Sequence, residues 1–453
     1  MRGRIIMSDK LFFRGTLILT FTGLASRIMG FFYRIFLSHT IGAQGVGIYQ
    51  LTLPVHGIIL AAAGMGIQAA ISRLCASLTA LGKEKESRNT LLLGMFLSGI
   101  VSLLLSAGVY LNADFIAGEL LKEARTASLL RILAFSFPLS ALHSCVNSFY
   151  YARKKTGLPA FIQLLEQTAR IGSTYVIYLV LLSEGKEVSA VIAAGGALFS
   201  EIVAMAACFL ALGMDFSREN YHPFSGFWMR FSQKGSVLSS LKEISEIAVP
   251  HSANRLLLTV LSGIEMVLIP QQLLLAGMTQ TDALAVYGIF TGMALPLILF
   301  PATITNSASV MLMPSVAGLQ ALGYEKRIRY VIRRTLGTCF FFGAFCTLFF
   351  FVFGKPLGSF LFHSETAGVY IKILAFICPF LYTNTALESI MNGLGRPDAC
   401  LFHNVAGVCI RIGFVILSVP SIGIRGYFYG MLISQLILTL LHFIYLNRMK
   451  LSD

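Results

Sequence analysis

Long apolar segments separated by short polar loops constrain this fold more than any other feature of the sequence. Of the 453 residues, 56% are hydrophobic and only 12% are charged. A soluble domain carries about a quarter charged residues, whereas a helix that spans a membrane needs roughly 20 consecutive apolar residues. We therefore predict an all-α polytopic membrane protein of about twelve transmembrane helices, at 12–38, 47–78, 90–111, 127–151, 160–183, 188–212, 245–274, 283–320, 330–353, 368–393, 398–418 and 421–447.

Lysine and arginine are unevenly distributed over the predicted loops. With the N-terminus in the cytoplasm, 22 of the 35 Lys and Arg residues fall in cytoplasmic segments, 7 in outer segments and 6 within spans. This asymmetry is the positive-inside rule, so we predict that both termini are cytoplasmic. The net charge of +14 is explained by this orientation, and we expect no nucleic-acid partner. The eight cysteines lack paired spacing, so we expect buried apolar residues and neither a metal site nor disulfides.

Short sequences from the first half of the chain recur in the second half. Each returns in order after 241 or 242 residues: RILAFSFP (131–138) as KILAFICP (372–379), ALGKEK (80–85) as ALGYEK (321–326), RIG (170–172) as RIG (411–413), and Leu53-Pro54 as Leu295-Pro296. We predict two six-helix lobes, 1–212 and 245–453, joined by a cytoplasmic amphipathic linker at 213–244. Because six is even, the lobes form a parallel repeat, which favours a central cavity between them.

The first predicted span carries two arginines, although a charge at mid-membrane costs roughly 3 kcal/mol even on the mildest scale. Arg27 and Arg34 are two helical turns apart and share a face with Gly23 and Gly30. Such a face must line a protein interior or a wet cavity. One interpretation is pairing with a distant carboxylate or snorkelling to the membrane surface. The favoured interpretation is that both cations line a path for an anionic substrate.

Two further basic residues extend this hypothesis. Arg255 opens a stripe with Thr259 and Ser262 in the seventh predicted span, and we expect it to contact the same anionic substrate. Arg73 lies near the cytoplasmic end of the second span, where it either anchors the helix or contacts substrate.

Carboxylates within the spans indicate ion pairs or coupling sites. Glu166 and Arg170 are i,i+4 neighbours in the favourable order, so we predict that they neutralise each other. Arg411 is a candidate partner for Glu388. Glu388 and Glu265 are candidates for coupling transport to H⁺ or Na⁺, with the membrane potential as another driving force. We expect no other cofactor.

Several of these residues carry a family resemblance. The motif S/T-R-x-x-G-F stands here as Ser26-Arg27-Ile28-Met29-Gly30-Phe31, a G-x-x-G-x-G-x-Y loop runs over 42–49, and QLLEQTARI occupies 163–171. The chain resembles the multidrug/oligosaccharidyl-lipid/polysaccharide exporter superfamily, closest to the stage V sporulation protein B-like polysaccharide biosynthesis branch. The resemblance implies two six-helix lobes around a cavity, a bacterial cytoplasmic membrane location, and contact of Arg27 with a pyrophosphate.

The residues and the resemblance together predict a flippase. It would move undecaprenyl-pyrophosphate-linked oligosaccharide, a lipid II-type peptidoglycan or polysaccharide precursor, by alternating access. The alternative is a cation-coupled exporter of drugs or toxic compounds with the same fold. A membrane glycosyltransferase would need an acidic metal site or a sizeable soluble domain, so we do not expect an enzyme. The expected partners are the lipid-linked glycan, membrane lipids and proteins of cell-wall synthesis.

Overall fold

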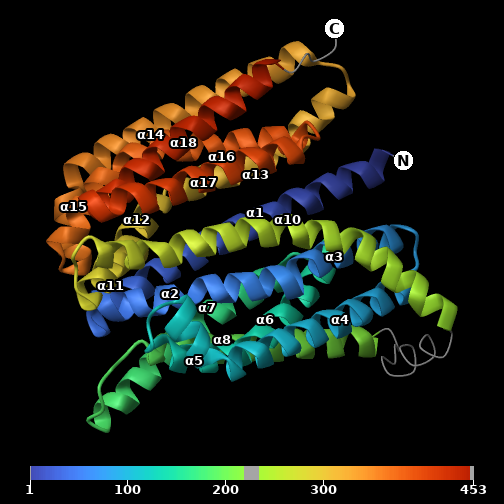
Figure 1. Cartoon of the computed structure of the whole chain (residues 1–453). Coiled ribbons are helices and arrows are strands. Elements are labelled where there is room, and N and C mark those ends of the chain that lie inside the picture. The colour runs from blue at the N-terminus through green and yellow to red at the C-terminus, as the bar shows by residue number, and fades with distance from the viewer. Residues whose placement is uncertain (1, 219–233, 449–453) are drawn as a thin grey trace. The chain divides into compact units, whose positions relative to one another are not determined.

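The predicted all-α architecture is confirmed in the part of the chain that the structure describes. This computed structural model describes residues 2–218 and 234–448, and every regular element in these two ranges is a helix (Figure 1). The middle of the predicted linker at 213–244, residues 219–233, lies outside the described residues.

The chain packs as two compact units, Met1–Tyr33 with Thr52–Val260 and Arg34–Leu51 with Leu261–Asp453. The two six-helix lobes, 1–212 and 245–453, remain a prediction. The boundaries of the two compact units differ from those of the predicted lobes. The first part of α10 (Lys234–Leu275) belongs to the N-terminal unit, and the 34–51 segment belongs to the C-terminal unit.

Close backbone contact explains why the 34–51 segment packs with the C-terminal unit. A Cβ added at Gly47 would overlap the carbonyl oxygen of Leu284, and one added at Gly288 would overlap that of Ala43. Gly47 lies in α2 (Gly42–Leu60) and Gly288 in α11 (Gln280–Gly288). Glycine at both positions lets these two helices approach with their backbones in contact, which a larger residue would prevent.

The N-terminal unit contains α1 as far as Tyr33, α2 from Thr52 onward, α10 as far as Val260 and the helices between them. Their bounds are α1 (Arg2–Thr40), α2 (Gly42–Leu60), η1 (Ala61–Met65), α3 (Gly66–Ala80), α4 (Glu84–Leu111), α5 (Ala113–Phe115), η2 (Ile116–Leu120), α6 (Thr126–Ala152), α7 (Gly157–Ser183) and α8 (Val191–Arg218). Its core includes the fully buried Ile71, Leu91, Phe149 and Ile162.

The C-terminal unit contains the remaining helices. They are α11 (Gln280–Gly288), η3 (Ile289–Ala294), α12 (Leu295–Leu299), α13 (Ala302–Ala321), α14 (Glu325–Phe362), α15 (Glu365–Leu374), η4 (Ala375–Ile377), α16 (Cys378–Gly393), α17 (Pro397–Ile422) and α18 (Ile424–Arg448). Val316, Leu387, Ile390 and Met391 form part of its core.

Ten helical stretches within the described ranges are long and apolar enough to cross a membrane. The protein is therefore a multi-span membrane protein, as predicted. The predicted spans 12–38 and 160–183 form α1 and α7 but are not among the ten. Glu166 and Arg170 lower the hydropathy of α7. The twelve-span, two-lobe arrangement stays a prediction.

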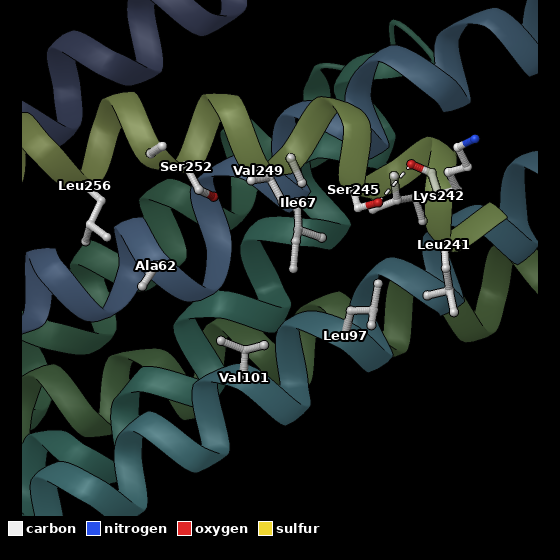
Figure 2. Close-up of a pocket in the computed structure, with 13 residues that line it drawn as sticks. Ala62, Ile67, Leu97, Val101, Leu241, Lys242, Ser245, Val249, Ser252 and Leu256 are labelled. Atoms are coloured by element: carbon white, nitrogen blue, oxygen red, sulfur yellow. Dashed lines mark hydrogen bonds between the residues drawn. The ribbon is translucent and has the colours of Figure 1, made fainter. Parts of the chain in front are cut away.

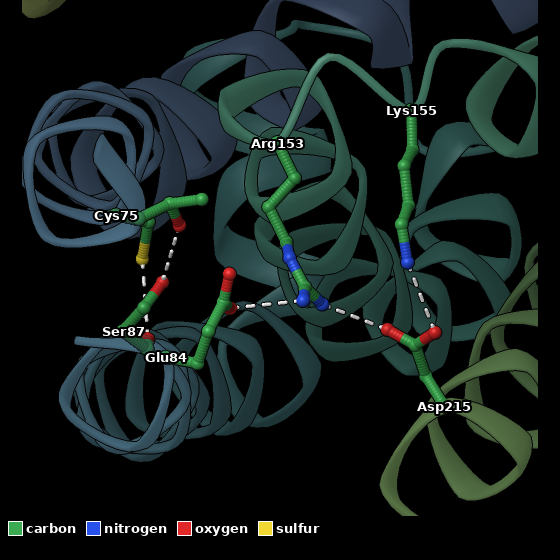
Figure 3. Close-up of polar contacts among 7 residues, drawn as sticks. Cys75, Glu84, Ser87, Arg153, Lys155 and Asp215 are labelled. Atoms are coloured by element: carbon green, nitrogen blue, oxygen red, sulfur yellow. Dashed lines mark hydrogen bonds and ion pairs between the residues drawn. The ribbon is translucent and has the colours of Figure 1, made fainter. Parts of the chain in front are cut away.

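A charged network joins three helices of the N-terminal unit at one end (Figure 3). The buried Arg153, at the C-terminus of α6, donates to Glu84 at the start of α4 (2.9 Å) and to Asp215 near the end of α8 (2.8 Å). Lys155 donates to the other oxygen of Asp215 at 3.2 Å. Arg153 and Lys155, which belong to a predicted cytoplasmic loop, therefore also hold the ends of α4, α6 and α8 together.

Candidate substrate-binding and coupling sites

The glycine and arginine face of α1 is open. Because α1 is continuous from Arg2 to Thr40, Gly23, Arg27, Gly30 and Arg34 share one side of the helix. Arg27 is exposed and Arg34 is half-buried. Within the described part of the chain, a Cβ added at Gly23 or Gly30 would meet no atom within 4 Å. The face therefore borders space and not a packed helix, as a substrate-lining surface requires.

The other two predicted substrate contacts are also exposed. Arg255 lies on α10 and Arg73 on α3. The Thr259 hydroxyl donates to the backbone carbonyl of Arg255 at 2.7 Å, and a Cβ added at Gly57 of α2 would lie 3.2 Å from the Thr259 methyl group. Thr259 thus packs α10 against α2. A common site for the four arginines stays a prediction.

The structure forms the predicted ion pair between Glu166 and Arg170. The Nη2 of Arg170 lies 2.5 Å from Oε1 of Glu166, and its Nε donates to Ser200 of α8 at 3.4 Å. The Arg170 and Glu166 side chains are 24% and 17% exposed, so most of each charge is withdrawn from solvent. The pair therefore neutralises two intramembrane charges and links α7 to α8.

A second titratable pair in the N-terminal unit was missed by the sequence analysis. Nδ1 of His143 on α6 lies 2.9 Å from Oε2 of Glu201 on α8, and both side chains are buried. Glu166 interacts electrostatically with both residues. A carboxylate within a span signals that Glu201 needs a partner, but no spacing rule points to a histidine 58 residues away.

We expect an exchange of Glu166 and Arg170 to preserve much of what either alanine variant loses. Each single alanine leaves a mostly buried charge, at a cost of about 3 kcal/mol. The exchange keeps the pair but reverses its favourable order, which costs only a few tenths of a kcal/mol, and it removes the contact with Ser200. Fluorescence-detected size-exclusion chromatography measures folded protein, and transport is assayed in the same membranes.

The same exchange at Glu325 and Arg329 is the control, because this pair has identical i,i+4 spacing but a longer separation of 3.8 Å and an arginine that is 64% exposed. It should change both quantities far less. If the exchanged Glu166/Arg170 variant were folded yet as inactive as the single variants, the pair would participate directly in transport.

The predicted partner of Arg411 was wrong. Arg411 of α17 pairs with Glu265 of α10 and not with Glu388: Nε lies 2.6 Å from Oε1 and Nη2 lies 3.0 Å from Oε2. The Tyr427 hydroxyl of α18 donates to the same carboxylate at 2.7 Å. Glu265 is only 3% exposed. Helix packing decided this pairing, because α10 brings Glu265 within bidentate reach of the guanidinium.

Glu388 of α16 instead lies beside Cys400 of α17 and His442 of α18. One potential ligand atom from each of the three lies within 4.8 Å of the others. His442 is fully buried, and its Nδ1 lies 3.3 Å from the carbonyl oxygen of Leu438, so this nitrogen donates and Nε2 carries the lone pair. The cluster offers donor types that hold a proton or a cation.

Family comparisons agree with this architecture. A model of the polysaccharide biosynthesis protein family matches residues 12–320, and the MatE family model matches residues 261–417. Stage V sporulation protein B of Bacillus subtilis (strain 168) is 26% identical over 438 residues, which cover 96% of this chain and 83% of that protein. Lipid II flippase MurJ of the same organism is 24% identical over 442 residues, with coverages of 92% and 78%.

Solved structures show the same fold. An inward-facing multidrug resistance MATE family transporter of the MOP superfamily superposes with a TM-score of 0.74 at 16% identity, covering 94% of each chain. Lipid II flippase MurJ in an inward closed conformation gives a TM-score of 0.72 at 13% identity, covering 95% of this chain and 87% of that one. Because the family model spans more than half of the sequence, the chain belongs to the polysaccharide biosynthesis protein family.

Proposed function

We propose that this protein flips an undecaprenyl-pyrophosphate-linked oligosaccharide across the bacterial cytoplasmic membrane, with both termini in the cytoplasm. The substrate would be a lipid II-type peptidoglycan or a polysaccharide precursor. The protein would act as a transporter and not as an enzyme. A lipid II flippase and a sporulation protein among its relatives support this substrate class.

The observation that carries the proposal is the open glycine and arginine face of α1. Arg27 is exposed on that face, and the adjoining glycines leave space for a ligand. A guanidinium is planar and pairs two phosphate oxygens at once, so it suits a pyrophosphate better than a neutral drug. Arg34, Arg255 and Arg73 would provide further positive charge along the path.

Alternating access would move the head group while the prenyl tail remains in the apolar part of the membrane. The coupling groups would be drawn from the buried polar pairs, Glu166 with Arg170 and Glu265 with Arg411, and from Glu388. Protons, Na⁺ or the membrane potential would supply the driving force.

A cation-coupled exporter of drugs is the second candidate, and one observation favours it. The buried His143 and Glu201 pair places a titratable carboxylate inside the N-terminal unit, and a MATE family transporter shares the fold. Against this candidate, Glu201 is already paired, and α1 presents arginines where an exporter of cations would be expected to present carboxylates.

Lipid co-purification tests the proposal. The full-length protein is purified from bacterial membranes in mild detergent, and its bound lipids are identified by mass spectrometry. We expect a polyprenyl-pyrophosphate-linked saccharide to be enriched over its share of total membrane lipid. Purification with phospholipids alone, together with export of cationic dyes by reconstituted vesicles, would instead establish the drug exporter.

A further inference from the structure

An apolar groove runs along α10 on the N-terminal unit. It encloses about 790 Å³ between α10, η1, α3 and α4. Figure 2 shows Lys242 toward one end of the groove and Leu256 toward the other, with Ala62, Leu97 and Val101 across from them. Ten of the thirteen lining residues are apolar, and the others are Lys242, Ser245 and Ser252.

The walls of the groove are held in place. A Cβ added at Gly66 would overlap Ser252 and the carbonyl oxygen of Ala248, so the start of α3 lies directly against α10. The π-helical turn η1 is tied to α4 by the Ser98 hydroxyl, which donates to the carbonyl oxygen of Ala63 at 2.8 Å. A groove with fixed walls is a built feature of the unit and does not depend on a ligand to form.

Its surroundings indicate a hydrocarbon ligand. The groove lies along the candidate membrane span Leu241–Leu275, and its lining residues Val101 and Val249 are 36% and 64% exposed. In a bilayer, such an opening faces acyl chains and not water. An apolar groove there is filled by a hydrocarbon chain, because water would gain few hydrogen bonds in it.

The charges in the groove lining favour a hydrocarbon chain that carries an anionic head group. The lining has one cation and no acidic residue. The cation, Lys242, lies three residues before the predicted span 245–274, at the cytoplasmic end of the span, where lysine is enriched. Its described ionic contact is the exposed Glu246 at 4.0 Å, which is at the limit of an ion pair. Thirteen residues further along α10, about 20 Å, stands the predicted substrate contact Arg255.

We propose that this groove binds the head-proximal isoprene units of the substrate's undecaprenyl tail, with Lys242 beside the pyrophosphate as the lipid enters. The inference rests on the proposed function and adds the place where the tail is held. The volume lies within the range of about 300–1,000 Å³ for pockets that hold small ligands, so the groove holds part of the tail and leaves the rest in the bilayer. One helix would then carry both the tail groove and a head-group contact.

Filling the groove tests the proposal. Val249→Trp on α10 and Val101→Trp on α4 place a large ring in the groove from exposed positions, so folding should be unaffected. The matched controls are Leu257→Trp and Leu104→Trp, which sit on the same helices, are 47% and 69% exposed and do not line the groove. The full-length proteins are purified, and binding of undecaprenyl pyrophosphate, inorganic pyrophosphate and phosphatidylglycerol is measured by native mass spectrometry.

We expect the groove variants to bind undecaprenyl pyrophosphate about tenfold more weakly than wild type, because buried apolar contact is lost. Their binding of inorganic pyrophosphate should be unchanged, and both control variants should behave as wild type. Unchanged binding of undecaprenyl pyrophosphate in the groove variants would overturn the tail site while leaving the proposed function intact.

Two other outcomes would also refute the tail site. If the groove variants lost phosphatidylglycerol but kept undecaprenyl pyrophosphate, the groove would hold ordinary membrane lipid and the proposal would fail. If wild type bound neither pyrophosphate nor its prenyl ester, the proposed function would fail and the tail site with it.

Discussion

Replacing Arg27 with alanine should reduce flipping about 100-fold while the protein remains folded in the membrane. A bidentate pair of charge-assisted hydrogen bonds to a pyrophosphate is worth about 3 kcal/mol, which corresponds to that factor. Because the Arg27 side chain is exposed on an open face of α1, its truncation should cost little stability. The measurement pairs the flipping rate with the amount of folded protein in the same membranes.

Conservative and distant substitutions sharpen this test. Arg27→Lys keeps the charge but loses the planar fork, so partial activity is expected. Arg255→Ala should be similarly damaging if α10 presents a second phosphate contact. Arg329→Ala removes another exposed arginine, on α14, and should leave flipping unchanged. Full activity of both the Arg27→Ala and Arg255→Ala variants would refute the phosphate contact, and a loss of activity only in proportion to a loss of protein would assign Arg27 a structural role.

Local features of these sites could be predicted from the sequence. Helical periodicity alone puts Arg27 and Arg34 on one face with two glycines, and i,i+4 spacing alone pairs Glu166 with Arg170. Both depend on the geometry of a single helix, which is nearly independent of its surroundings. The all-α membrane fold follows equally directly from the length of the apolar segments.

Contacts between helices could not be predicted in this way. Arg411 has two carboxylates within spans of its own half, Glu265 and Glu388, and only the packing of α10 and α18 around α17 decides for Glu265. The packing of the 34–51 segment with the C-terminal unit depends on the backbone contact at Gly47 and Gly288, which the repeat pattern does not reveal. Such contacts join residues far apart in the chain, so spacing rules carry no information about them.

Removing Arg411 should have the largest effect on stability of any substitution considered. Arg411→Ala leaves the carboxylate of Glu265, which is 3% exposed, with only the Tyr427 hydroxyl among the contacts described above. Breaking one partner of a buried ion pair costs about 3–5 kcal/mol, so we expect a large loss of folded protein and a lower midpoint of thermal unfolding. Glu265→Ala should be equally damaging, because it strands the guanidinium.

The double substitution Glu265→Leu with Arg411→Leu separates structure from transport. Replacing both charges by apolar residues of similar size is often neutral or stabilising, so folded protein should return to near the wild-type amount. If Glu265 also carries the coupling proton or cation, this folded variant will bind substrate but will not respond to an imposed ion gradient. A double variant that transports with wild-type ion dependence would show that the pair only holds α10, α17 and α18 together, and coupling would then be sought at Glu388 or at Glu166, His143 and Glu201. The ion response is measured on the folded double variant, so that response and not the protein level gives the answer.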